Sequence, residues 1–147
     1  MKHNRILALL LVMALAATVL AGCGGADSYK DGTYTGKSTV FEGDEGEGDG
    51  YGVVTLTIEG GAITACDFKT YEPDGTLKDE DYGKQNGEIA NQDYYNKAQK
   101  ALAGANEYAK ILVEVGDYHA IDSISGATIS YNQFMEAVDD ALYQAKE

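Results

Sequence analysis

The chain has 147 residues, and its 24 aspartates and glutamates against 11 lysines and arginines give a net charge of −13 at pH 7. This excess of negative charge excludes nucleic acids and other polyanions as partners, because the surface would repel them. Two cysteines are too few for a disulfide framework or a cysteine-based metal centre, and the length is that of one domain with a single core.

The first 22 residues have the pattern of an export signal. A basic leader over residues 2–5 precedes an almost unbroken apolar run over residues 6–20, which is short for a membrane span and typical of a signal-peptide core. The run ends in Leu-Ala-Gly-Cys at residues 20–23, which resembles a bacterial lipobox. The alternatives are an uncleaved N-terminal anchor and a simple secretory signal that ends near a cysteine.

The lipobox predicts cleavage before Cys23 and lipidation of its thiol by diacylglycerol, with fatty acids such as palmitate. The 11 basic residues less Lys2 and Arg5 leave 9 against 24 acidic ones, so the mature chain has a net charge of −15. Acyl chains contribute about 0.8 kcal/mol per buried methylene, so more than one chain anchors the protein despite repulsion from anionic lipids. The predicted parts are a signal peptide (1–22), a lipidated tether (23–30) and one domain (31–147). The lipid-anchored protein is expected on the extracytoplasmic face of the cell membrane.

The first half of this domain predicts antiparallel strands. The pattern turns to strand from Asp31, where β-branched and aromatic residues between residues 34 and 41 favour a half-buried strand. Apolar and polar residues then alternate over residues 54–59, two glycines make a turn, and residues 62–69 return as the second arm of a hairpin. Cys66 lies on this arm, where a lone thiol packs as a small hydrophobe, and a catalytic thiol is the alternative.

Residues 42–50 interleave glycines with five carboxylates. Such a segment cannot pack a core and predicts a mobile, solvated loop. A calcium site is the alternative, but the spacing does not match an EF-hand loop and no terminal Glu lies at the required distance. We therefore predict no metal site.

The second half of the domain predicts helices. A polar stretch over residues 76–90 is expected to be a loop or a ragged helical turn. Apolar residues at three- and four-residue spacing predict a helix from about residue 93, interrupted near Gly104 and ending at Gly116.

The last helix is predicted from an apolar stripe over residues 131–145, with Ser130 and Gln133 as a capping box. The predicted fold class is α+β, a small antiparallel sheet packed by two or three helices.

Residues 122–128, Asp-Ser-Ile-Ser-Gly-Ala-Thr, lie directly before this last helix. Thr128 would precede the N-cap Ser130 by two positions. Free N–H groups and the positive end of the helix dipole would then face a phosphate attached to the Thr128 hydroxyl.

The other residues of this run suit an exposed acceptor loop. Gly126 and Ala127 leave room around the hydroxyl, and Gly126 can take a backbone angle that is closed to other residues. Asp122 and Ser125 can bond the nearby backbone and hold the loop in shape. A plain turn before a helix is the alternative.

The run resembles the flavin-attachment motif of the FMN-binding domain family: Asp, two variable residues, Ser or Thr, then Gly-Ala-Thr. The resemblance covers about residues 31–145 and includes Asp-Gly-Thr-Tyr at residues 31–34. It implies that an exported FAD:protein FMN transferase, which needs a divalent metal, esterifies the Thr128 hydroxyl with FMN. Ser123 departs slightly from the family's commonest pattern, in which a small residue such as Ala or Gly is also usual after the Asp. The recognition sequence implied by the resemblance is Asp122, Ser125, Gly126 and Ala127.

The resemblance implies a single FMN-binding domain that carries electrons and is not an enzyme in its own right. A membrane quinol or dehydrogenase would donate the electrons, and another redox carrier or an extracellular acceptor would receive them. The lipobox makes the chain similar to the lipoprotein branch of the family. The alternatives are a non-redox surface lipoprotein that binds a solute or partner, and an accessory subunit of an ion-pumping respiratory complex.

Other side chains are candidates for a hydrolase nucleophile, a catalytic base or flavin contacts. Ser125 lacks the G-x-S-x-G elbow of a hydrolase nucleophile. His119 has no assignable orienting partner, and is either an ordinary loop residue or one that lines the flavin edge. Several tyrosines could stack on a flavin ring or serve as amphipathic boundary residues: Tyr94, Tyr95, Tyr118 and Tyr131.

Overall fold

The computed structural model describes residues 29–44 and 47–146. The predicted signal peptide, Cys23 and most of the tether lie outside these residues. Within the described ranges, no helix has the length and apolar character needed to cross a membrane.

Three antiparallel strands form the sheet: β1 (Gly32–Lys37), β2 (Tyr51–Glu59) and β3 (Ala62–Tyr71). They are hydrogen-bonded in the order β1-β2-β3. Gly60 and Gly61, with φ of 61° and 75°, form the turn between β2 and β3. Both central positions of such a two-residue turn need positive φ, so the predicted hairpin is confirmed with its glycines in place.

The first strand ends at Lys37, short of the predicted residue 41. The Gly52 N–H donates to the Ser38 hydroxyl at 2.9 Å, where a longer strand would continue its backbone ladder. Phe41 then makes only an isolated bridge with Gly50.

Two helices follow the sheet, α1 (Gln92–Val115) and α2 (Thr128–Ala145), with the 3-10 helix η2 (Tyr118–Ala120) between them. The Asn91 side chain caps the start of α1 by accepting from the Tyr94 amide, and Gly116 ends it with φ of 72°, as predicted. The predicted interruption at Gly104 is wrong, because α1 continues through it as one helix of 24 residues.

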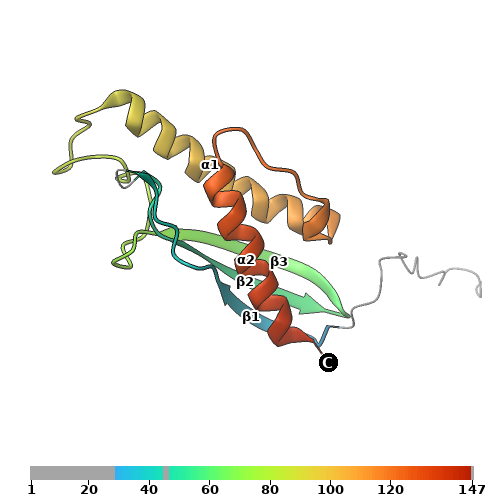
Figure 1. Cartoon of the computed structure of the whole chain (residues 1–147). Coiled ribbons are helices and arrows are strands. Elements are labelled where there is room, and N and C mark those ends of the chain that lie inside the picture. The colour runs from blue at the N-terminus through green and yellow to red at the C-terminus, as the bar shows by residue number, and fades with distance from the viewer. Residues whose placement is uncertain (1–28, 45–46, 147) are drawn as a thin grey trace, which may run out of the picture.

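Both helices lie on one face of the sheet, with α2 crossing β1 and β2 while α1 contacts β3 (Figure 1). Val54, Leu56 and Ile58 of β2 point into this layer and are at most 1% exposed. They form one core with Phe134 and Val138 of α2. A three-stranded sheet covered by two helices confirms the predicted α+β fold.

The backbones of β1 and α2 approach each other at Gly36. A Cβ there would lie 2.0 Å from the Ala137 carbonyl oxygen and 2.4 Å from the Ala141 amide nitrogen. Only glycine permits this approach. At the far end of the same contact, the Lys30 amide donates to the Ala145 carbonyl at 2.9 Å, which joins the entry to β1 with the end of α2.

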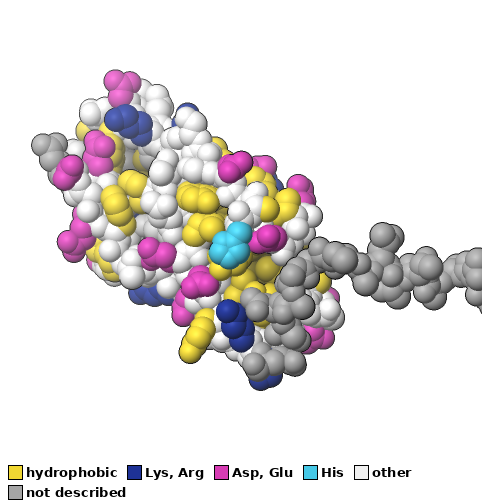
Figure 2. All heavy atoms as spheres, turned by 45° about the vertical axis from the view of Figure 1, so that its right-hand side comes forward, with side chains coloured by type: hydrophobic (Ala, Val, Ile, Leu, Met, Phe, Trp, Pro, Cys, Tyr) yellow, Lys and Arg dark blue, Asp and Glu magenta, His cyan; other side chains and the backbone are white. Residues whose placement is uncertain are grey.

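The charge imbalance is visible on the surface. Figure 2 shows carboxylates around the face that it presents, fewer lysines, and hydrophobic side chains exposed between them. The face shown has no continuous basic patch.

Candidate functional site

The motif loop, residues 122–127, turns sharply just before α2. The Ala127 amide donates to the Ile124 carbonyl at 3.0 Å, and Gly126 between them has φ of 85°. A residue with a Cβ is strained in this region, so the turn requires the glycine that the sequence places there. Thr128 follows as the first residue of α2, and it is exposed.

The start of α2 corrects the predicted N-cap. The helix begins at Thr128 with Ala127 as its N-cap, and alanine has no side-chain acceptor for the first amides. Ser130 is buried in the first turn and Gln133 donates to the Gly50 carbonyl at 2.9 Å, so the predicted capping box is wrong. The open N–H groups therefore begin at the residue that carries the hydroxyl. This brings the positive end of the helix dipole closer to Thr128 than predicted.

Two tyrosines hold the motif loop and the residue before it, a role that the sequence analysis missed. The Tyr108 hydroxyl of α1 is buried, donates to the Ala127 carbonyl (3.2 Å) and accepts from the Ile124 N–H (2.7 Å). The Tyr131 hydroxyl of α2 donates to the Ile121 carbonyl at 2.9 Å. Each tyrosine is a phenol on an otherwise apolar helix face. Because a buried phenol needs a hydrogen-bond partner, this pattern could have predicted contacts with a neighbouring backbone.

Gly104 lets α1 lie directly against the motif loop. A Cβ at residue 104 would lie only 2.4 Å from the Ala127 Cβ, so one of the two segments would have to move. This contact explains why a glycine sits inside an unbroken helix.

Gly104→Ala is therefore expected to lower the free energy of unfolding by about 1–3 kcal/mol through overpacking. At an exposed helical site the same change would stabilise the protein by about 1 kcal/mol. The sign of the change in unfolding free energy therefore shows whether Gly104 is packed against the motif loop. Urea unfolding measures the change, with Asn106→Ala on the exposed face of α1 as a control that should cost nothing. A stabilised Gly104→Ala variant contradicts the close contact.

A cavity of about 270 Å³ lies beside Thr128. A second cavity, of about 430 Å³, shares Thr70, Lys78 and Leu102 with it, so the two adjoin. The first is lined by residues of the motif loop, α2, α1, β3 and two connecting loops: Gly48, Thr70, Lys78, Tyr82, Ala101, Leu102, Gly126, Ala127, Thr128, Ile129, Ser130 and Gln133.

The structure divides the predicted recognition sequence into two groups. Gly126 and Ala127 line the cavity together with Thr128. Asp122 and Ser125 do not line it and are exposed on the motif loop. The exposed pair is accessible to another protein, while the small residues border the space next to the hydroxyl.

The cavity contains a buried cation that the sequence analysis did not single out. Lys78 is 8% exposed, and its ammonium donates to the Gly48 carbonyl (3.2 Å) and lies 4.6 Å from the centre of the Tyr82 ring. Burial lowers the pKa of Lys78, and the charges of Glu72 and Asp49 oppose this effect. Burial also raises the pKa of Tyr82, which keeps its hydroxyl neutral at ordinary pH.

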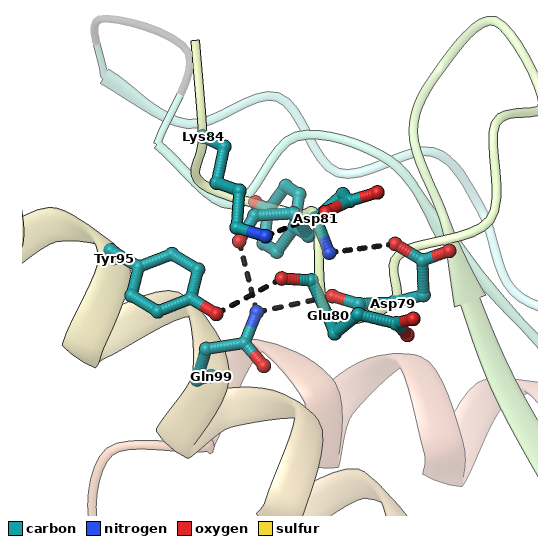
Figure 3. A network of polar contacts seen from close by, with 7 residues as sticks. Asp79, Glu80, Asp81, Lys84, Tyr95 and Gln99 are labelled. Carbon is teal, nitrogen blue, oxygen red and sulfur yellow. Dashed lines mark hydrogen bonds and ion pairs between the residues drawn. The ribbon is translucent and has the colours of Figure 1, made fainter. Parts of the chain in front are cut away.

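The loop over residues 77–84, which carries this cation, is fixed to α1 (Figure 3). Gln99 donates to the carbonyls of Asp79 and Tyr82, both at 3.0 Å, and the Tyr95 hydroxyl donates to a third loop carbonyl at 3.0 Å. The polar loop expected from the sequence is therefore an ordered wall of the cavity.

Other predicted candidates lie elsewhere. His119 is exposed in η2, with its ring 4.0 Å from that of Tyr118, and neither residue lines the cavity beside Thr128. The same holds for Tyr94 and Tyr95 of α1. Tyr131 lines a separate cavity of about 490 Å³. Tyr82, which was not singled out, is the tyrosine at the Thr128 cavity.

Cys66 lies half-buried on β3, and burial together with the Asp67 charge raises its pKa to about 12. Because the thiolate is the nucleophile, this environment disfavours a catalytic role. At pH 8, alkylation of Cys66 in the lipidated chain, where the Cys23 thiol is blocked, is expected to be on the order of a thousandfold slower than that of a free cysteine. Mass spectrometry over time measures this rate, and equal rates in folded and urea-unfolded protein contradict the shielding.

Residues 45–46 of the acidic loop lie outside the described residues. In the remainder of the chain that the structure describes, no three His, Cys, Asp or Glu side chains are grouped to hold a metal ion. The calcium alternative gains no support from this arrangement.

Comparisons with known proteins agree with the resemblance noted in the sequence. A family model described as the FMN-binding domain matches residues 47–143. The crystal structure of the CPE2226 protein from Clostridium perfringens has 24% identity and a TM-score of 0.57, covers 80% of this chain and 88% of its own, and shows the same fold. A solution NMR structure from Clostridium thermocellum has 26% identity and a TM-score of 0.43, with coverage of 80% and 93%. No curated protein matches the chain significantly.

Proposed function

Because this chain belongs to the FMN-binding domain family, we propose that it is an electron carrier whose FMN is esterified to the Thr128 hydroxyl. The observation that carries the proposal is the position of this hydroxyl. It is exposed at the first residue of α2 and borders a cavity that holds the buried Lys78.

The surroundings of Thr128 fit a phosphate ester. The Ala127 cap leaves the first N–H groups of α2 without a side-chain acceptor, and such groups bind phosphate at helix N-termini. Gly126 has no side chain to crowd the ester, and the nearest atoms to a Cβ there belong to the flexible end of Lys100, with Nζ at 3.1 Å. In the adjoining cavity, the Lys78 ammonium and the Tyr82 ring fit an aromatic ring system that carries hydrogen-bond acceptors.

Attachment of the cofactor requires a partner enzyme, for which the exposed motif loop is suited. In the active site of an FAD:protein FMN transferase, the Thr128 hydroxyl would attack the FMN phosphorus of FAD. The phosphorus–oxygen bond to AMP breaks, AMP leaves, and the hydroxyl proton passes to solvent. Asp122 and Ser125 are exposed for recognition by the transferase. Once bound, FMN supplies reversible electron transfer, while the protein supplies placement and tuning.

The proposed carrier works at the extracytoplasmic face of the membrane, anchored by lipid on Cys23. Residues 24–30 reach at most about 25 Å when extended, so the domain stays near the membrane. The donor would be a membrane quinol or dehydrogenase, and the acceptor another redox carrier. On this proposal the chain is not itself an enzyme.

Mass spectrometry of the protein purified from membranes of its native host tests the proposal. The expected mass is that of the chain from Cys23 with its lipid and one FMN less one water, and digestion should place the flavin on the peptide that contains Thr128. A colourless protein with that peptide unmodified would favour the non-redox surface lipoprotein. Stable co-purification of integral membrane subunits would favour the accessory subunit of a respiratory complex.

A further inference from the structure

The ammonium of Lys78 has more N–H donors than the hydrogen bonds it makes among the described residues. It carries three N–H groups, and among the described residues it makes one hydrogen bond, to the Gly48 carbonyl at 3.2 Å. Lys78 is 8% exposed and lines both cavities, so a ligand in either cavity could accept from the other two. A buried charge is costly unless it is paired and hydrogen-bonded, so this site is suited to a ligand with acceptor atoms.

The position of Lys78 indicates which part of a bound FMN it would meet. Thr128, which would carry the phosphate, is exposed, whereas Lys78 is buried between the two adjoining cavities. The amides at the start of α2 already provide donors for the phosphate. The smaller cavity alone is slightly below the usual size of small-molecule sites, about 300–1,000 Å³, and the two together lie within that range.

We propose that Lys78 and Tyr82 bind the isoalloxazine ring of FMN, with the Lys78 ammonium donating to the acceptor atoms of the ring's pyrimidine edge. This inference rests on the proposed function and adds two ring-binding residues to it. A positive charge at this edge stabilises the electron-rich reduced ring more than the oxidised ring. Lys78 therefore raises the midpoint potential of the carrier.

Hydrogen bonds within the protein hold the loop that carries Lys78. Hydrogen bonds from Gln99 and Tyr95 fix the following loop residues to α1, as Figure 3 shows. Burial lowers the pKa of Lys78, and the nearby charges of Glu72 and Asp49 oppose this effect. Because these internal hydrogen bonds restrict the loop, little further ordering has to accompany binding of the ring.

Lys78→Met tests the inference, because it removes the charge and keeps the length of the side chain. The variant is expected to accept FMN on Thr128 as the parent does, but with a lower midpoint potential in a spectroscopic redox titration. A tenfold loss of preference for the reduced ring corresponds to a downward shift of about 30 mV for two electrons, and we expect at least this shift. Lys78→Arg should retain most of the potential. Lys97→Met, the same charge change at an exposed position on α1, should leave it unchanged.

A second measurement does not require the ester. Riboflavin, which has the ring but no phosphate, is titrated into the unloaded Thr128→Val chain and followed by fluorescence quenching. Its affinity should fall at least tenfold when Lys78→Met or Tyr82→Leu is added. Tyr82→Leu also keeps the inference testable if Lys78→Met does not fold.

The outcomes separate this inference from the proposed function. An unmodified Thr128 with lysine-dependent riboflavin binding overturns the ester and keeps the ring site. Unchanged potential and unchanged riboflavin affinity in Lys78→Met overturn the ring contact while the ester stands. A shifted ³¹P resonance of the ester with an unchanged potential assigns the ammonium to the phosphate and also overturns the ring contact.

Discussion

Thr128→Val is expected to abolish covalent flavin attachment in protein co-expressed with the transferase and to leave the fold intact. Valine keeps the shape of threonine but lacks the hydroxyl that forms the ester. The Thr128 side chain is exposed, and among the described residues its hydroxyl has only a long contact with the Ser123 hydroxyl at 3.5 Å. The change in stability should therefore stay within about 0.5 kcal/mol. Intact mass and visible absorption measure the loss of flavin, and thermal unfolding measures the fold.

The neighbouring hydroxyls provide the controls for this prediction. Thr128→Ser keeps a hydroxyl at the same position and should retain flavin. Ser123→Ala removes the long contact and should also retain it. Flavin still present in Thr128→Val, mapped by digestion to Ser123 or Ser125, would show that the acceptor has been assigned to the wrong residue.

Gly36→Ala is expected to lower the free energy of unfolding by about 3 kcal/mol, the upper end of the usual cost of overpacking. The new Cβ would meet backbone atoms of α2, the Ala137 carbonyl and the Ala141 amide, and not a flexible side chain. Relief therefore requires α2 to move away from β1. Urea unfolding followed by circular dichroism measures the effect.

Gly87→Ala is the matched control for Gly36→Ala. Position 87 has open space around a Cβ but a φ of 78°, so its cost is backbone strain alone, about 1 kcal/mol. Flavin attachment per folded molecule should be unaffected by Gly36→Ala, because Gly36 contacts α2 far from Thr128. A Gly36→Ala variant no less stable than Gly87→Ala contradicts the backbone contact.

Local signals in the sequence were sufficient for much of the fold. The hairpin follows from period-two alternation around two adjacent glycines that both take positive φ. The end of α1 at Gly116 follows from the same property of glycine. The turn at Gly126 before Thr128 was also predictable, because the residues that define it are neighbours in the chain.

The features that the sequence analysis missed depend on contacts between distant segments. Ser130 and Gln133 have the spacing of a capping box, but Gln133 instead satisfies the Gly50 carbonyl across the fold. Gly104 predicts an interruption of the helix from its residue type alone, but the structure shows that it is needed for the close contact with the motif loop. Lys78 lies in a polar stretch that predicts a loop or a ragged helical turn, and the packing of that loop on α1 accompanies its burial. None of these contacts leaves a periodic pattern in the sequence.

The direction of α2 has a consequence for how the proposed carrier could exchange electrons with a membrane. Its 18 residues span about 27 Å, with Thr128 at one end and Ala145, bonded to Lys30 near the tether, at the other. The proposed redox centre at Thr128 and the residue that leads to the proposed anchor, Lys30, thus lie near opposite ends of α2. A domain standing upright would offer its flavin to soluble acceptors in the medium. To meet a donor embedded in the bilayer, the same domain would have to tilt on its short tether until α2 lies along the membrane. Reduction and reoxidation of the proposed flavin would then take place in two different orientations of the domain.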